Sequence, residues 1–119
     1  TDTRDAEATI AQIKALASAG CDIVRITVPD VEAAKTILAI KEEGITTCVE
    51  TCGEFSPAHL SALCGVTDLF LWDVKDTDPT LHKAYTGVDN TRILHNLREA
   101  DRLGARTQMW VFAPFLRLC

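Results

Sequence analysis

Two spacings of apolar residues alternate along this chain and predict helices and strands in turn. Short apolar runs at about residues 22–28, 45–51, 68–74 and 106–112 are typical of strands. The segments between these runs carry apolar residues three or four positions apart, as amphipathic helices do. This regular alternation predicts an α/β fold with four parallel strands joined by crossover helices.

The expected helices begin and end at residues that favour helix termini. The first covers about residues 4–19 and the last about residues 90–103. Pro57 and Pro79 each open a helix, because proline at the first helical position lacks only an amide that has no partner there. The other expected terminal residues are Thr3, Asp30, Gly44 and Gly104. The helix after Asp30 is expected to bury Val31, Ala34, Ile37 and Leu38. The last helix is expected to bury Ile93, Leu94, Leu97 and Ala100.

Polar residues stand at the ends of three of the apolar runs, where ligands of α/β proteins bind. These residues are Pro29 and Asp30, then Glu50, Thr51 and Cys52, then Asp73 and Lys75. Because side chains alternate along a strand, Asp73 and Lys75 share one face. Glu50 likewise shares a face with Cys48 and Cys52.

Composition excludes two classes of partner. The chain has 119 residues, 47% of them hydrophobic, and a net charge of −5 with its basic residues spread out. It therefore offers no basic stripe to nucleic acid. No apolar run approaches the roughly 20 residues that span a bilayer, and the first residues lack a signal-peptide core. We expect a single cytoplasmic domain over residues 1–119 that contacts no membrane.

The cysteines and histidines do not form a metal-binding pattern. Because the cysteines are odd in number and lie mostly in apolar stretches, we expect reduced thiols rather than disulfides. They are Cys21, Cys48, Cys52, Cys64 and Cys119. The histidines lie on expected helices without paired spacing, which favours surface or capping positions. They are His59, His82 and His95.

Residues 1–9 (TDTRDAEAT), 12–13 (QI) and 20–25 (GCDIVR) carry the first of two family resemblances. Over about residues 1–35 the chain resembles the hydroxymethylbutenyl diphosphate synthases of the non-mevalonate isoprenoid pathway. The resemblance implies a barrel that holds a cyclic diphosphate with arginines, and a cluster on a separate domain. Arg25 matches an arginine of that family. It is either a substrate ligand or a strand arginine paired with an acid such as Asp30.

Residues 43–53 (EGITTCVETCG), 67–75 (TDLFLWDVK) and 85–90 (YTGVDN) carry the second resemblance. From about residue 41 to about residue 108 the chain resembles the radical S-adenosylmethionine activases of glycyl-radical enzymes. Both families are built from strand-helix units of barrel type. The chain is therefore expected to be chimera-like and to form half of a TIM-type, partial radical-SAM barrel, while residues 109–119 depart from both families.

The second resemblance implies S-adenosylmethionine and a four-iron four-sulfur cluster as cofactors. The family's cluster motif, Cys-x-x-x-Cys-x-x-Cys, lies upstream of the matched residues. Cys48 and Cys52 imitate its first spacing, but Phe55 stands where the third thiolate would fall. Four residues along an extended strand also separate two thiols by about 13 Å. We therefore expect these cysteines to be structural and the chain alone to be inactive.

The part of the cofactor pocket that remains would bind the methionine end of S-adenosylmethionine. By resemblance, Glu50 and Thr51 stand beside that end, and Asp73 and Lys75 match the family's Asp-x-Lys, with Lys75 on the cofactor carboxylate. The alternative is that the lysine and the two acids form a partly solvated ion pair at a strand end.

Three functional interpretations follow. The chain is a fragment of an activase of glycyl-radical enzymes, a fragment of an isoprenoid synthase, or an engineered or defective chimera with no activity. A half barrel leaves strand edges and apolar surface uncovered, so we expect self-association or pairing with a complementary barrel half.

Overall fold

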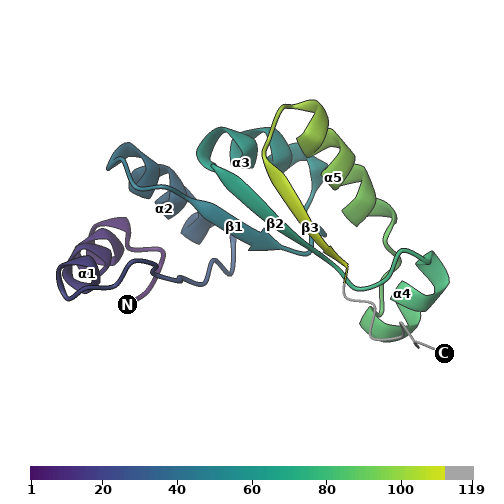
Figure 1. Cartoon of the computed structure of the whole chain (residues 1–119), viewed down its shortest axis with the longest axis horizontal. Helices are drawn as coiled ribbons and strands as arrows, with labels where there is room; N and C mark the ends of the chain where they lie inside the picture. Colours follow the sequence, from purple (N-terminus) through teal and green to yellow (C-terminus); the bar gives the residue numbers. More distant parts are fainter. Residues whose placement is uncertain (112–119) are drawn as a thin grey trace. The chain divides into compact units, whose positions relative to one another are not determined.

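The computed structural model describes residues 1–111 (Figure 1). They form two compact units, one over Thr1–Thr47 and a second that begins at Cys48. The boundary after Thr47 lies a few residues beyond the change of family resemblance that the sequence places between about residues 35 and 41. No helix among the described residues is long and apolar enough to cross a membrane. Residues 112–119, which include Cys119 and most of the segment expected to depart from both families, lie outside the described residues.

The first unit contains two helices, α1 (Ala6–Ser18) and α2 (Val31–Glu42). Asp30 caps α2 as expected, because its side chain accepts a hydrogen bond from the amide of Ala33 at 2.9 Å. The expected cap of α1 was wrong, since Asp5 rather than Thr3 accepts from the amide of Ala8. The Thr3 hydroxyl instead donates to the carbonyl of Thr27 at 2.8 Å.

The buried face of α2 differs from the predicted one. Ile37 is buried as expected, but Val31 and Leu38 are exposed. The buried residues of α2 are Ala33, Thr36, Ile37 and Ile40. The hydroxyl of Thr36 donates to the carbonyl of Thr3 at 2.5 Å, and this bond turns a polar residue inward. Apolar residues lie on several sides of α2, so spacing alone did not select the buried side.

The expected strand over residues 22–28 is not formed, and the sheet of the described residues has three strands rather than four. In this segment the side chain of Ile23 is 89% exposed, and the carbonyl of Thr27 accepts from a side chain. A segment becomes a strand only when it forms hydrogen bonds with a neighbouring strand. The apolar run at residues 22–28 does not specify such a neighbour, so the run alone did not predict the outcome.

The second unit contains the sheet. Its strands are β1 (Cys48–Thr51), β2 (Leu69–Val74) and β3 (Thr107–Val111), parallel and in the order β1-β2-β3. These strands confirm three of the four predicted runs. Glu50 lies opposite Leu71, and Leu71 lies opposite Gln108, so these three positions share one face of the sheet.

Helical segments connect the strands of the second unit. A short 3₁₀ helix, η1 (Pro57–His59), leads into α3 (Leu60–Val66) between β1 and β2. The helices α4 (Pro79–Thr86) and α5 (Thr91–Arg102) join β2 to β3. Pro57 and Pro79 open helices as predicted. Asp78 caps α4 by accepting from the amides of Thr80 and Leu81.

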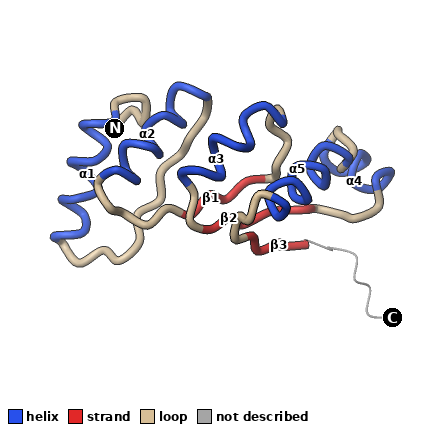
Figure 2. Tube along the Cα trace, turned by 90° about the horizontal axis from the view of Figure 1, so that it is seen from above, coloured by secondary structure: helices blue, strands red, loops and turns tan. Residues whose placement is uncertain are grey.

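The core of the second unit lies between one face of the sheet and two helices, α3 and α5, which cover the same side of the strands (Figure 2). Alternate side chains of β2 point into it and are fully buried: Phe70, Trp72 and Val74. Leu60 of α3 and Ile93 and Ala100 of α5 complete it. The buried face of α5 therefore agrees with the prediction. On the other face of β2, Leu69, Leu71 and Asp73 are half-buried.

His82 on α4 is buried, although the sequence predicted a surface or capping position. Its side chain is 2% exposed, and its Nδ1 lies 2.7 Å from the carbonyl oxygen of Val88 and 3.1 Å from the hydroxyl of Thr86. The imidazole thus holds the loop that follows α4. Spacing alone could not predict this, because the partner of His82 lies in a loop without periodicity.

Candidate functional site

Two of the predicted cofactor residues meet at the carboxyl end of β2. The ammonium of Lys75 lies 2.6 Å from the Oδ2 atom of Asp73, and the two side chains are 44% and 33% exposed. They form the ion pair that the sequence offered as the alternative to a cofactor site. The pair is partly open to solvent, so it exchanges partners more readily than a buried pair does.

Glu50 lies on the neighbouring strand and on the same face as this pair. It is exposed, and its position on β1 is opposite Leu71, two residues before Asp73. The register therefore places the carboxylate-bearing positions 50 and 73 on adjacent strands, close to the carboxyl ends of both. Thr51 is the next residue of β1 and therefore lies on the other face of the sheet. Its position pairs with Trp72, on the face that the helices cover.

The turn after β1 closely approaches the core. Gly53 has a φ of +78°, and a Cβ there would lie 2.5 Å from Nε1 of Trp72, so only glycine fits without displacement of the indole ring. The amide of Gly53 donates to the hydroxyl oxygen of Thr51 at 3.0 Å. The side chain of Asn96, on α5, donates to the carbonyls of Gly53 and Phe55 at 2.8 and 2.9 Å.

Asn96 was missed by the sequence analysis, although a signal for it exists. The apolar face of α5 includes Ile93, Leu97 and Ala100, and Asn96 lies on that same face. An amide at such a position must find hydrogen-bond partners inside the protein. The pattern thus marks Asn96 as a buried polar residue, but it does not identify the turn that it contacts.

The residues of this site do not fit an iron-sulfur cluster. Cys48 and Cys52 are exposed, and no three His, Cys, Asp or Glu side chains of the described residues converge on a point that could hold a metal ion. The ring of Phe55 packs edge-on against Trp72, with centroids 6.0 Å apart. Cys64 is half-buried, and burial raises the pKa of its thiol, which makes it a poor ligand and nucleophile.

The first unit has a cavity of about 320 Å³ that includes Arg25, the predicted substrate residue. Asp2, Arg4 and Gln12 also line it. Arg25 is exposed and lies in the segment between α1 and α2. The cavity thus carries two guanidinium groups, those of Arg4 and Arg25, together with the carboxylate of Asp2.

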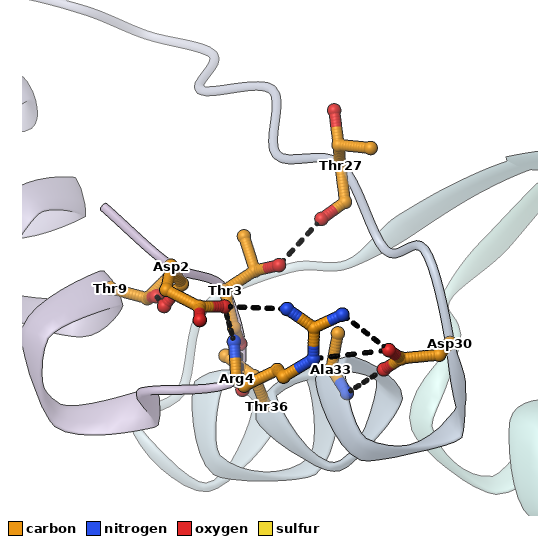
Figure 3. A network of polar contacts seen from close by, with 8 residues as sticks. All are labelled: Asp2, Thr3, Arg4, Thr9, Thr27, Asp30, Ala33 and Thr36. Atoms are coloured by element: carbon orange, nitrogen blue, oxygen red, sulfur yellow. Dashed lines mark hydrogen bonds and ion pairs between the residues drawn. The ribbon is translucent and has the colours of Figure 1, made fainter.

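Arg4 is held at this cavity by carboxylates on both sides, as Figure 3 shows. Its guanidinium donates to Oδ2 of Asp30 at 2.6 and 3.0 Å and lies 3.3 Å from Oδ1 of Asp2. These contacts join the first turn of the chain to the start of α2. Asp30, which the sequence suggested as a partner of Arg25, is thus paired with Arg4.

The same contacts shift two pKa values. The hydrogen bond from the amide of Ala33, followed by the bond from Arg4, lowers the pKa of Asp30 below its usual range. The hydrogen bond to Asp30, together with the charges of Asp30 and Asp2, raises the pKa of Arg4. Asp30 therefore stays ionised, and Arg4 stays charged, throughout the neutral pH range.

Comparison with known proteins identifies the family of the first part of the chain. Residues 1–65 match the GcpE TIM-barrel domain. The chain belongs to this family. It is 63% identical to the 4-hydroxy-3-methylbut-2-en-1-yl diphosphate synthase (flavodoxin) of Geobacter sulfurreducens over 43 residues, which are 36% of the chain and 12% of that protein. The GcpE match and this similarity confirm the first resemblance, the one to the hydroxymethylbutenyl diphosphate synthases.

The chain is also similar to activating enzymes. It is 45% identical to the choline trimethylamine-lyase activating enzyme of Oleidesulfovibrio alaskensis over 67 residues, and these residues are 56% of the chain and 22% of that protein. It is 41% identical to the (2S)-3-sulfopropanediol dehydratase activating enzyme of Klebsiella oxytoca over 64 residues, and these residues are 54% of the chain and 20% of that protein. The second resemblance is thus confirmed. The chain spans about a fifth of these relatives.

A solved structure supports the fold. A domain of a pyruvate-formate lyase-activating enzyme from Bacteroides vulgatus superposes with a TM-score of 0.60 over 65% of the chain and 48% of that domain's chain. The sequence identity is 22%, so the likeness concerns the fold. An α/β fragment with a parallel three-stranded sheet is therefore established.

Proposed function

We propose that this chain is a fragment of a radical S-adenosylmethionine activase-type barrel whose second unit binds the methionine end of the cofactor. The observation that carries this proposal is the ion pair of Asp73 and Lys75 at the end of β2, with Glu50 on the same face of the adjacent strand. Its wider support is the similarity to two activating enzymes.

The charges of this site suit an amino acid group. The ammonium of Lys75 would exchange Asp73 for the cofactor carboxylate, and the carboxylates of Glu50 and Asp73 would accept hydrogen bonds from the cofactor's amino group. The carbonyl of Thr51, at the end of β1, would face the same group. Because the exchange breaks an ion pair of 2.6 Å, we expect weak affinity.

The proposed role is binding without catalysis by this chain alone. A radical activase also needs an iron-sulfur cluster, and the cysteines of the described residues do not fit one. Oxidoreductase activity on a glycyl-radical enzyme, in the cytoplasm, would then require cluster ligands from a complementary barrel half. Mixing such a half with this chain should restore cluster binding and strengthen cofactor binding, and an unchanged mixture would argue against the fragment interpretation.

Equilibrium dialysis with S-adenosylmethionine tests the binding site. The variant Lys75→Ala should lose most of the affinity of the unmodified chain, because it removes the cation that faces the carboxylate. Lys83→Ala is the matched control, since Lys83 is an exposed lysine of α4 in the same unit. Equal affinity of both variants and the unmodified chain would show that the Lys75 site does not bind this cofactor.

A second candidate function is supported by the cavity of the first unit and by the GcpE match. In this alternative the chain is an isoprenoid-synthase fragment, and Arg25 contacts the phosphates of a cyclic diphosphate. Dialysis against pyrophosphate should show weaker binding in Arg25→Ala than in Arg98→Ala, a control at an exposed arginine of α5. No difference between the two variants would exclude this site.

A third proposal concerns the state of the chain. The two family matches suggest a chimera-like sequence, natural or engineered. The outer strands β1 and β3 each pair only with β2 among the described strands. We expect these edges to promote self-association. Sedimentation at tens of micromolar should show species larger than a monomer, and a single sharp monomer boundary would contradict this expectation.

A further inference from the structure

Asn96 is a buried amide that joins α5 to the turn after β1. Its side chain is 0% exposed, and its Nδ2 donates to two carbonyls that lie 43 and 41 residues earlier in the chain, those of Gly53 and Phe55. Both distances, 2.8 and 2.9 Å, are those of good hydrogen bonds. Helix α5 thus contacts the backbone that directly follows Glu50 and Thr51.

The orientation of this amide is determined by its neighbours. Backbone carbonyls only accept hydrogen bonds, so the NH₂ group of Asn96 must face Gly53 and Phe55. Its Oδ1 atom has no hydrogen-bond partner within the described residues. The rest of this helix face is apolar, and the two hydrogen bonds that Asn96 donates explain why an amide is tolerated there.

Two further contacts restrain the same turn. Thr51 accepts from the amide of Gly53, and the indole of Trp72 fills the space beside the α-carbon of Gly53. Asn96 adds two hydrogen bonds that reach this turn from α5, and Arg92 of the same helix lies 3.8 Å from Oε1 of Glu54 in the turn. The end of β1 is thereby tied to the helix layer beneath it as well as to its own strand.

We infer that Asn96 is a positioning residue for the methionine-binding end of β1, which carries Glu50 and Thr51 beside the end of β2 that carries Asp73. This inference rests on the proposed function, because it concerns the same ligand. Asn96 itself lies on the helix-covered side of the sheet and does not touch the ligand. Its effect on binding passes through the backbone of residues 52–55.

A pair of variants on α5 separates positioning from general stability. Asn96→Leu keeps a side chain of similar size on the apolar face but removes both donated bonds. Ile93→Val is the matched control, since Ile93 is buried on the same helix and belongs to the apolar core. Both variants are made in the full 119-residue chain.

The two measurements are dialysis with S-adenosylmethionine and amide hydrogen exchange at Gly53 and Phe55. In Asn96→Leu we expect about tenfold weaker binding, as the loss of one or two hydrogen bonds implies. We also expect about tenfold faster exchange of the Gly53 amide, because the turn opens more readily once its carbonyls lose the bonds from Asn96. In Ile93→Val the affinity should stay within about twofold, because cofactor contacts and turn restraints are retained.

The outcomes distinguish this inference from the proposed function. If the unmodified chain does not bind S-adenosylmethionine, the proposed function is wrong, and the positioning role falls with it. If the unmodified chain binds and Asn96→Leu binds equally well, only the role of Asn96 is overturned. If exchange at Gly53 is accelerated equally in Asn96→Leu and Ile93→Val, the role of Asn96 is also overturned.

A measurement on the unmodified chain decides the question if Asn96→Leu does not fold. The side-chain NH₂ signals of Asn96 are followed by NMR during titration with S-adenosylmethionine. They should shift together with the amide signals of Glu50 and Gly53. Asn96 signals that stay fixed while those of Glu50 move would overturn the positioning role.

Discussion

The two units of this chain are organised by different interactions. The second unit has an apolar core with Phe70, Trp72 and Val74 fully buried between a sheet and two helices. In the first unit, two threonines, Thr9 and Thr36, are buried along with apolar residues, and side-chain hydrogen bonds link its turns. Apolar packing therefore dominates the interior of the second unit, whereas buried polar contacts contribute to that of the first, with different consequences for stability.

This difference also separates the two candidate sites. The site at β1 and β2 lies on a sheet whose register is set by a packed core, so its residues have defined relative positions. The cavity at Arg25 depends on exposed ion pairs, which contribute little stability each. Substitutions should therefore affect the two units by different amounts.

The largest expected effect is on the apolar core. Phe70→Ala removes a ring that is 0% exposed and lies 5.7 Å from Trp72, and it should lower the free energy of unfolding of the second unit by about 3–5 kcal/mol. Urea unfolding followed by circular dichroism measures this loss. Leu81→Ala, on the exposed face of α4, is the control and should cost below about 1 kcal/mol. Equal losses would contradict the role assigned to the core.

The next effect concerns the close approach of the turn to Trp72. Gly53 and Gly104 have nearly the same φ, +78° and +80°, but only Gly53 has a neighbour where a Cβ would lie. Alanine should cost about 1 kcal/mol at both positions because of φ, and about 1–3 kcal/mol more at Gly53 because of overlap. Thermal unfolding of the two variants gives the difference directly. Identical melting points would show that the indole moves freely.

A smaller effect is expected in the polar network of the first unit. Thr36→Val keeps the shape of the side chain but loses the bond to the carbonyl of Thr3, which should cost about 1 kcal/mol. Hydrogen exchange of the α2 amides reports this loss. Thr36→Ser retains the hydroxyl and should stay closer to the unmodified chain. Unchanged hydrogen exchange in Thr36→Val would show that the bond from Thr36 to the carbonyl of Thr3 does not stabilise the first unit.

The smallest effect is the pH dependence of the α2 cap. The folded pKa of Asp30 is lowered, so its stabilising contribution is complete above the unfolded value of about 3.9 and is lost as the pH falls through the lower folded pKa. The amide shift of Ala33 should therefore titrate at acidic pH with the carboxyl carbon of Asp30. In Asp30→Asn, which still caps but does not titrate, this change should vanish.

Three helix starts that depend on local chemistry were predictable from the sequence, although the cap of α1 was not. The helix starts at Asp30, Pro57 and Pro79 were confirmed, because a cap or a first-turn proline acts within a few residues. The strand over residues 22–28 was not formed, since its pairing depends on residues elsewhere in the chain. The difference between local and non-local contacts accounts for both outcomes.

The candidate sites were predictable only in part. Alternation along β2 correctly placed Asp73 and Lys75 together, and the ion pair was one of the two arrangements expected. The role of Asn96 was not predicted, because it connects residues 43 positions apart. For Arg25, the expected partner Asp30 is held by Arg4, which the spacing of charges did not indicate.

The loop contact of His82 has a spectroscopic consequence. Because Nδ1 lies 2.7 Å from the carbonyl oxygen of Val88, which can only accept a hydrogen bond, that nitrogen carries a proton and donates it. The ring is thus held as a single tautomer inside α4 and its loop. Its Nδ1 proton, sheltered from water, should appear as a distinct downfield resonance that reports directly whether residues 82–88 are folded.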